Sequence, residues 1–184
     1  MLTLTNHWVD QARKVPSPNF NARPDPEDIS LVVIHNISLP PEEFGGPQVE
    51  AFFQNRLDPS EHPYFEEIRD LKVSSHFLIR RDGELVQFVA CDQRAWHAGV
   101  SRWRDRDNCN DFALGIEHTT GRSDGVAPRL RAEHNTKSAL EALKREMAGR
   151  AHAEADAKAA ESYYTQQMVK LRREMQQREA KLPL

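Results

Sequence analysis

The sequence predicts an α/β domain with a mixed central β-sheet flanked by helices, truncated and followed by an unrelated helical C-terminal segment. Three segments predict the sheet: a β-branched run at 31–34, a hairpin pattern at 77–89 and a short apolar segment at 112–117. Helix-type spacing and irregular loops lie between them, and strands interspersed with helices are typical of mixed α/β architectures.

The first expected strand is Leu31–Ile34, a continuous apolar run between turn formers, which is typical of a strand buried on both faces. Residues 16–28 are rich in Pro, Asn and Asp and predict an irregular segment, and the prolines and glycines of 38–47 predict a loop. Residues 48–57 then predict a short helix. Its core-facing side chains would be Val49, Phe52 and Phe53.

The next expected element is a β-hairpin made of 77–81 and 85–89. Asp82-Gly83 between them suits the positive φ angles of a tight type I′ turn. A third buried strand is expected at Phe112–Glu117, where the apolar run ends on a carboxylate.

The composition of the 184-residue chain changes after Glu117. Residues 118–184 carry 13 Lys and Arg against 9 Asp and Glu, a net charge of +4, which leaves −7 for residues 1–117. All Trp, Phe and Ile residues precede the change, and Ala occurs 12 times after it. Large apolar residues build cores, whereas Ala with charged residues builds exposed helix. We therefore expect an incomplete domain at 1–117, a linker at 118–137 and a charged helical segment at 138–181.

The helical segment begins with Ser138 and Glu141, which fit a capping box. Its apolar stripe is thin, so the segment is suited either to helix–helix contacts with a partner or to a solvated helix. An interaction protein that works through 138–181 is one functional hypothesis.

Composition and charge exclude several classes of protein. The overall net charge of −3 argues against binding to nucleic acid, which needs a basic surface. No run approaches the ~20 apolar residues that cross a bilayer, so we expect no membrane association. The N-terminus lacks a secretory signal layout, and Cys91 and Cys109 are too few for a disulfide scaffold. We expect reduced thiols and a cytoplasmic location.

Polar side chains at the ends of the expected strands are candidates for chemistry. His35 ends a buried strand, where sheets of this class present catalytic groups. Glu117 ends another, and a carboxylate there is costly unless it is exposed or functional. Trp96-His97 adds an aromatic and an imidazole, and His76 opens the hairpin. Together they indicate a metal or acid–base site.

These residues lie in a series of motifs that resembles the AmpD-type 1,6-anhydro-N-acetylmuramyl-L-alanine amidases, zinc hydrolases of cell-wall recycling related to phage-type amidases. The resemblance covers residues 1–117. Its motifs are RKVPSP (13–18), VIHNISLPP (33–41), EFGGP (43–47), HPYF (62–65), LIRRDGE (78–84), RAWHAGVS (94–101), CNDF (109–112) and GIE (115–117).

The resemblance implies zinc-dependent hydrolysis of the amide between anhydro-N-acetylmuramic acid and L-alanine of the stem peptide. It implies that His35 is a zinc ligand and that Glu117 is the general base. It also implies that Asn36, Trp96 and His97 line the groove for an anhydro-muropeptide, although Trp96 as a core residue remains an alternative.

The resemblance ends where the family would supply a second zinc histidine, a zinc aspartate and a lysine. His152 and Asp156, four residues apart on one helix face, are the candidate replacements. A frame shift near residue 118 or a fusion would each explain the break. The alternative function is therefore an inactive, muropeptide-binding remnant that has lost its C-terminal zinc ligands.

Overall fold

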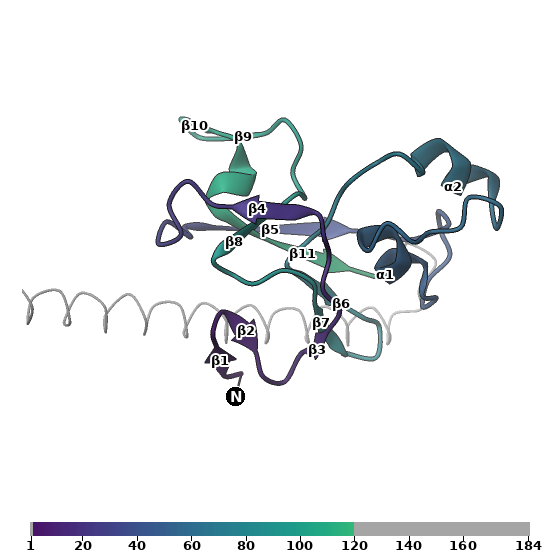
Figure 1. Cartoon of the computed structure of the whole chain (residues 1–184), viewed down its shortest axis with the longest axis horizontal. Coiled ribbons are helices and arrows are strands. Elements are labelled where there is room, and N and C mark those ends of the chain that lie inside the picture. The colour runs from purple at the N-terminus through teal and green to yellow at the C-terminus, as the bar shows by residue number, and fades with distance from the viewer. Residues whose placement is uncertain (1, 120–184) are drawn as a thin grey trace, which may run out of the picture. The chain divides into compact units, whose positions relative to one another are not determined.

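The computed structural model describes residues 2–119 of the chain (Figure 1). These residues form one five-stranded sheet, three two-stranded sheets, two short α-helices and one 3-10 turn. The expected helical segment at 138–181, with His152 and Asp156, lies outside the described residues. The expected linker at 118–137 also lies outside them beyond residue 119.

The five-stranded sheet has the order β3-β7-β6-β11-β5. Only β6 and β7 are antiparallel; β3 runs parallel to β7, and β11 runs parallel to both β6 and β5. The mixed sheet confirms the predicted fold class. The strands span Arg13–Lys14 (β3), Leu31–Asn36 (β5), Phe77–Ile79 (β6), Leu85–Gln87 (β7) and Ala113–His118 (β11).

The register of this sheet aligns one row of residues across all five strands. Glu117 of β11 pairs with His35 of β5 on one side and with Leu78 of β6 on the other. Leu78 pairs with Val86, which pairs with Arg13. Paired residues project from the same face of a sheet. His35 and Glu117 therefore share a face with Leu78 and Val86.

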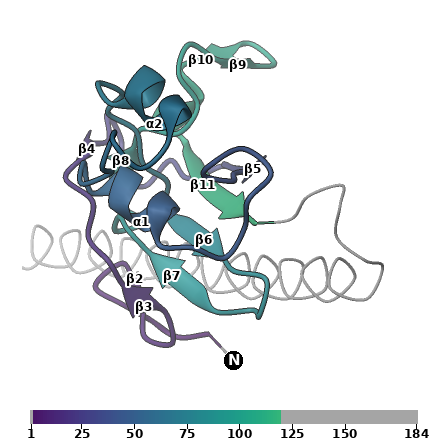
Figure 2. The ribbon, with the colours of Figure 1, turned by 90° about the vertical axis from the view of Figure 1, so that its right-hand side faces the viewer.

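That face packs against the two helices, α1 (Gln48–Phe53) and α2 (Pro63–Ile68), which Figure 2 shows on one side of β6, β7 and β11. The helix α2 begins with Pro63 at its first position, and the ring Nδ1 of His62 accepts a hydrogen bond from Tyr64 N–H. The buried core on this face consists of Leu39, Val49, Phe52, Phe53, Phe65, Ile68, Leu78, Val86, Phe88, Val89 and Ala95. The predicted inward side chains of α1 are confirmed, although the helix is shorter than expected.

The hairpin of β6 and β7 is confirmed, but its turn differs from the expected type I′ turn. Arg80 N–H donates to Glu84 O and Gly83 N–H donates to Arg80 O, so three residues, 81–83, form the loop. Gly83 has a positive φ of 92°, and Asp82 is not among the residues with positive φ. A type I turn followed by one left-handed glycine closes a three-residue hairpin loop.

The strand β5 is less buried than its continuous apolar run predicted. In the described part of the chain it is the outer strand of the sheet, beside β11 alone. Ile34 is 50% exposed, whereas all six residues of β11 are buried. The expectation of a strand buried on both faces is correct for β11 and wrong for β5, because composition does not reveal the position of a strand within its sheet.

The smaller sheets pair segments of irregular composition. The strand β4 (Phe20–Ala22) lies in the segment expected to be irregular, and it pairs antiparallel with β8 (Gln93–Ala95). The hairpin of β1 (Leu4–Thr5) and β2 (Trp8–Val9) opens the chain.

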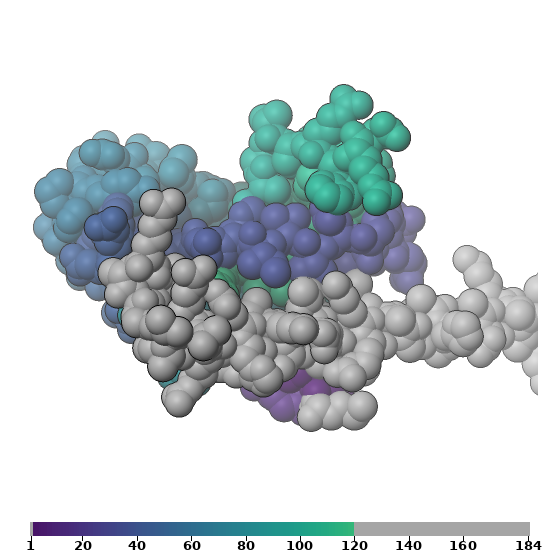
Figure 3. All heavy atoms as spheres, turned by 180° about the vertical axis from the view of Figure 1, so that it is seen from behind, coloured from purple at the N-terminus to yellow at the C-terminus, as the bar shows by residue number. Residues whose placement is uncertain are grey.

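A third two-stranded sheet, the hairpin of β9 (Arg102–Trp103) and β10 (Arg106–Asp107), stands out from the rest in Figures 1 and 3. It leads to the 3-10 turn η1 (Cys109–Asp111) and then directly to β11. Cys91 and Cys109 are buried, and neither is part of a disulfide bond within the described residues. In the described part of the chain, none of the helices has the length and apolar character needed to cross a membrane.

Candidate functional site

The site begins with a carboxylate and an imidazole on neighbouring parallel strands. Glu117 is only 6% exposed, and its carboxyl group forms no hydrogen bond or ion pair with another described residue. Burial raises the pKa of its carboxyl group to about 7, because an ionised carboxylate loses its hydration there. A carboxylate with a pKa near neutrality is suited to accept and return a proton.

His35, the partner of Glu117 in the register, touches a second imidazole. Its Nε2 lies 3.1 Å from Nδ1 of His97, and the two rings meet edge to face with centroids 5.3 Å apart. Burial lowers the pKa of His35, and burial together with the positive charge of neighbouring groups lowers the pKa of His97 to about 3. Both rings are therefore neutral near pH 7, so one of the two nitrogens donates and the other accepts.

The backbone around His97 is held at two points. Asn110 Oδ1 accepts hydrogen bonds from the N–H groups of His97 and Ala98, at 3.1 and 2.9 Å. Trp96 N–H donates to Ser74 Oγ at 3.1 Å, and Ser74 N–H donates to Trp96 O at 3.0 Å. His97 thus follows β8 in a defined position beside β11.

The ring of His97 rests against the backbone of Gly115, two residues before Glu117. A Cβ atom at position 115 would lie 2.5 Å from His97 Cγ, 2.7 Å from its Cδ2 and 2.8 Å from Ser75 Oγ. These are distances that real Cβ atoms do not adopt, so only glycine leaves room for the imidazole. A glycine inside a strand often marks such a close approach, and this signal was present in the sequence.

His76, expected as a member of the site, has a structural role. It is fully buried, its Nδ1 accepts from Gly115 N–H and its Nε2 lies 3.0 Å from Gln93 O. These two bonds place the ring proton on Nε2 and join β8 to β11. Burial first, and then the charge of Arg23, keeps the pKa of His76 well below its ordinary value.

Arg23 is a buried cation that the motif analysis did not single out. It is 5% exposed and its guanidinium lies 3.0 Å from His76 Nε2. Burial lowers the pKa of Arg23 to about 10. It donates to four backbone carbonyls, those of Cys91, Asn110, Asp111 and Ala113. It therefore ties the segments on either side of His97 to each other.

Asn36 and Trp96 do not converge on the pair of imidazoles. Asn36 follows His35 in β5 and so projects from the opposite face, where its Oδ1 lies 3.1 Å from Nδ1 of His118. Trp96 is partly buried and its Nε1–H donates to Asn21 Oδ1 at 2.7 Å. The groove role of Asn36, Trp96 and His97 stays a prediction.

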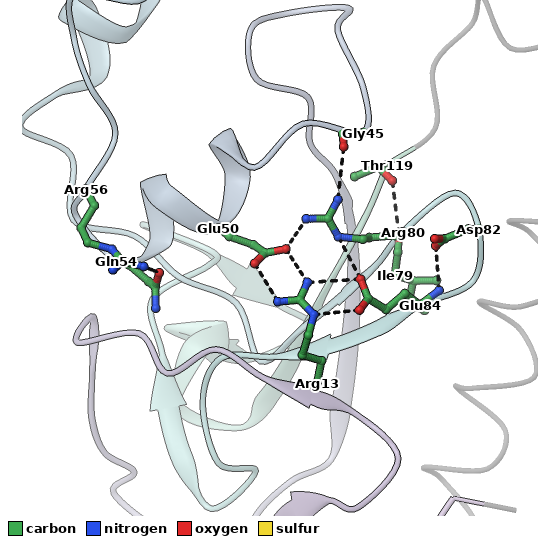
Figure 4. Close-up of polar contacts among 10 residues, drawn as sticks. All are labelled: Arg13, Gly45, Glu50, Gln54, Arg56, Ile79, Arg80, Asp82, Glu84 and Thr119. Atoms are coloured by element: carbon green, nitrogen blue, oxygen red, sulfur yellow. Dashed lines mark hydrogen bonds and ion pairs between the residues drawn. The ribbon is translucent and has the colours of Figure 1, made fainter.

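An ion network lies beside the loop that follows β5, and Figure 4 shows its members. Glu50 of α1 pairs with Arg13 of β3 at 2.7 Å and with Arg80 at the end of β6. Glu84 pairs with the same two arginines, at 2.7 and 3.2 Å, and Arg80 Nη1 donates to Gly45 O. The arginines lower the pKa of Glu50 to about 2. The network joins α1 and the loop at Gly45 to the β6–β7 hairpin.

The donors present determine whether a metal ion fits this site. Between residues 2 and 119, no group of three or more His, Cys, Asp or Glu side chains is arranged to hold a metal. His35 has the features of a single ligand: its Nε2 meets His97, and its Nδ1 forms no hydrogen bond with another described residue. A ligating histidine ordinarily uses its second nitrogen in this way. The described residues fit one ligand and a neighbouring base.

An imidazole and a buried carboxylate lie side by side on neighbouring strands of a mixed sheet, and such a pair is suited to acid–base chemistry. The chain belongs to the N-acetylmuramoyl-L-alanine amidase family, whose sequence profile matches residues 25–173. The profile extends past residue 117, where the resemblance in motifs ends.

Individual relatives of this chain are amidases of one named type. The 1,6-anhydro-N-acetylmuramyl-L-alanine amidase AmpD of Citrobacter freundii is 58% identical over 116 residues, which is 63% of this chain and 62% of that protein. The AmpD of Escherichia coli K12 is 57% identical over 116 residues, 63% of each chain. The chain thus spans less than two thirds of these relatives' length.

Solved AmpD structures share the fold. A crystal structure of a selenomethionine AmpD derivative superposes with a TM-score of 0.68 at 50% identity, covering 75% of this chain and 78% of that one. The solution structure of Citrobacter freundii AmpD gives a TM-score of 0.55 at 47% identity, covering 80% and 76%.

Proposed function

We propose that this protein is a zinc-dependent amidase that hydrolyses the amide between anhydro-N-acetylmuramic acid and L-alanine of the stem peptide, in cytoplasmic recycling of peptidoglycan. The observation that carries the proposal is the parallel register that sets Glu117 beside His35 on one face of the sheet. The AmpD relatives, which carry this activity in their names, support the choice of substrate.

In this proposal His35 would be one of the residues that hold the zinc ion. Zinc, when bound, lowers the pKa of a water molecule from about 15.7 to about 7 and polarises the amide carbonyl. Glu117 takes the proton of the attacking water as the new C–O bond forms. It then delivers that proton to the alanine nitrogen as the C–N bond breaks. Its raised pKa supports both transfers.

A catalytic zinc site takes three protein ligands. The other two would have to come from outside residues 2–119, and His152 with Asp156 remain the candidates from the sequence. The muropeptide would lie along Trp96, with Asn36 and His97 as further contacts. Nucleic acid and membranes are not part of the proposal, and helix–helix contacts through 138–181 remain a separate hypothesis.

A second candidate is an inactive remnant that binds anhydro-muropeptides without hydrolysing them, after a frame shift or fusion. Two observations favour it: residues 2–119 contain no three-ligand cluster, and the chain matches only about 62% of the length of its relatives. In this alternative the chain still binds the muropeptide in the predicted groove, but it holds no zinc ion.

The test uses the full chain, dialysed and assayed for zinc and for release of peptide from an anhydro-N-acetylmuramyl-peptide. We expect about one zinc per chain, lost in His35→Ala and kept in Glu117→Gln. Loss of a general base lowers kcat by roughly 10² to 10⁴. The matched control is Glu67→Gln, an exposed residue of α2, which should change neither quantity.

The two candidates give different results. Muropeptide that raises the melting temperature without being cleaved, in a chain free of zinc, would select the remnant. A chain that neither binds zinc nor responds to muropeptide would reject both candidates.

A further inference from the structure

We propose that Asn21 is a positioning residue for Trp96: its side-chain oxygen holds the indole ring in the orientation in which the ring contacts the muropeptide. The choice of ligand rests on the proposed function, whereas the position of the ring concerns the chain alone. Asn21 lies outside the motif series, in the segment that the sequence predicted to be irregular. Its role follows from the pairing of β4 with β8.

The contact between Asn21 and Trp96 crosses from β4 to the residue that follows β8. Asn21 pairs with Arg94 in the register of these antiparallel strands, and Trp96, two residues after Arg94, continues on the same face. Trp96 Nε1–H donates to Asn21 Oδ1 at 2.7 Å, and Arg94 Nη1 donates to the same oxygen at 3.2 Å. The register of the two strands therefore brings the amide to the edge of the indole.

The two donors fix the orientation of the Asn21 amide. An indole N–H and a guanidinium N–H can only donate, so the atom of Asn21 that meets both of them is its oxygen. Arg94 is itself held from another side, because its Nε forms an ion pair with Asp111 of η1. The side chains of Arg94 and Asp111 are 25% and 29% exposed, so this pair is partly shielded from water. The oxygen of Asn21 is thus kept directed at the indole.

The backbone of Trp96 is held by the same segment of chain as its ring. Ser74 Oγ accepts from Trp96 N–H at 3.1 Å and donates to Asn19 O at 2.6 Å, and Ser74 is buried. The backbone and the ring of Trp96 are therefore both connected to residues 19–21. Trp96 is nonetheless only partly buried, so part of its surface remains accessible to a ligand.

An aromatic ring that is fixed before binding favours a ligand that packs against it, because the ring loses no further freedom in the complex. Ordering one such side chain only on binding weakens a complex by about 2- to 10-fold. Asn21 would supply this factor through the indole of Trp96. Its effect on affinity should therefore depend on the presence of that indole.

The position of the ring can be tested without substrate. In the ¹⁵N-labelled full chain, the indole N–H signal of Trp96 is assigned by its loss in Trp96→Phe, and its exchange with water is measured. We expect exchange to be about 2- to 10-fold faster in Asn21→Leu, which keeps the approximate shape of the side chain but removes the acceptor. Asn21→Asp, which keeps an oxygen there, should restore slow exchange. The indole signals of Trp8 and Trp103 are internal controls and should not change.

A binding measurement tests whether the position of the ring matters to the ligand. Anhydro-N-acetylmuramyl-peptide is titrated calorimetrically into the full chain carrying Glu117→Gln, in which we expect hydrolysis to be slow. Asn21→Leu should raise Kd by about 2- to 10-fold, and Asn21→Asp should recover most of the affinity. In a Trp96→Ala chain, which should itself bind more weakly, adding Asn21→Leu should have no further effect. Gln11→Leu is the control, because it removes an exposed amide that accepts a backbone N–H in the N-terminal segment.

The failure of this inference and the failure of the proposed function give different results. Indole exchange at Trp96 that Asn21→Leu leaves unchanged in a folded chain would overturn the positioning role even if the chain cleaves muropeptide. An unchanged Kd in Trp96→Ala, or an equal effect of Asn21→Leu with and without the indole, would also overturn it. A chain that neither holds zinc nor cleaves muropeptide, but binds it with the expected dependence on residues 21 and 96, would overturn the proposed amidase activity and support this inference.

Discussion

Glu117 combines three properties that rarely occur together in one residue. It is ionisable, it is almost completely buried, and its carboxyl group has no hydrogen-bonding or charged partner among the described residues. A structural carboxylate in such a place would ordinarily be paired. Ionisation of the Glu117 carboxyl group should therefore lower the free energy of unfolding of the metal-free chain.

The folded-state pKa of Glu117 is raised to about 7 from an ordinary 4.5, so between these values the folded chain holds a proton that the unfolded chain has released. The free energy of unfolding should fall as the pH rises through this window, by about 3 kcal/mol, and stay level above pH 7. In Glu117→Gln this loss is absent. Urea unfolding with chelator present, at pH 5 and pH 8, should show the variant gaining over the unsubstituted chain only at the higher pH.

Glu67→Gln is the control for this experiment. Glu67 lies on the exposed face of α2, so removing its charge should not change how the free energy of unfolding depends on pH. A stability difference between Glu117→Gln and the unsubstituted chain that is the same at both pH values would contradict the raised pKa.

At the scale of elements, α1 is attached to the sheet in two ways. Its apolar side chains enter the core, and Glu50 binds arginines from two strands of the sheet (Figure 4). Glu50 is shielded, with 14% of its side chain exposed, whereas Arg13 is 42% exposed. This network differs from isolated surface ion pairs because Glu50 is shielded from water and has two partners. Isolated surface pairs contribute little to the free energy of unfolding.

Replacing Glu50 by Gln should destabilise the fold by about 1 to 2 kcal/mol at pH 7, because two arginines lose their shared carboxylate. The pKa of Glu50 is lowered to about 2, so its contribution is present above the ordinary value of 4.5 and disappears as the pH falls toward 2. Urea unfolding at pH 7 and pH 3 should show the cost of Glu50→Gln shrinking at the lower pH.

The matched control is Glu66→Gln in α2. Its ion pair with Arg69 is more than half exposed on both sides, so its loss should change the free energy of unfolding by less than about 0.5 kcal/mol. Equal effects of the two substitutions would show that the network adds nothing beyond a surface pair.

At the scale of the whole described domain, Arg23 connects segments that are distant in sequence. Its guanidinium reaches carbonyls 68 to 90 residues further along the chain, near β8, η1 and the start of β11. These are the segments that carry His97, Asn110 and Gly115. The geometry of the candidate site thus depends on one buried cation.

Arg23→Met should destabilise the chain by about 3 to 5 kcal/mol, since it leaves several buried carbonyls without a donor. Arg23→Lys should recover little, because an ammonium group cannot reproduce the guanidinium fork. Denaturant unfolding measures both. Arg102→Met, on the exposed strand β9, serves as the control; a cost for Arg23→Met as small as that of the control would contradict this role.

Local sequence determined the elements and the family. The β-branched run, the hairpin around Gly83, the inward face of α1 and the apolar strand ending at Glu117 are all present. Each depends on residues close together in the chain, where side-chain periodicity is a direct consequence of backbone geometry. The motif series led to the amidase family for the same reason, since its members are short contiguous segments.

Tertiary structure alone decided which strand is enclosed and which groups meet. The apolar runs of β5 and β11 look alike, yet within residues 2–119 β11 lies between two strands and β5 beside one. His35 and His97 are 62 residues apart, and Arg23 and His76 are 53 apart. The periodicity of a helix or strand does not relate positions this far apart in the sequence. Their contacts arise from the order of strands in the sheet, and that order also determines whether a buried polar side chain holds the fold together or remains available for chemistry.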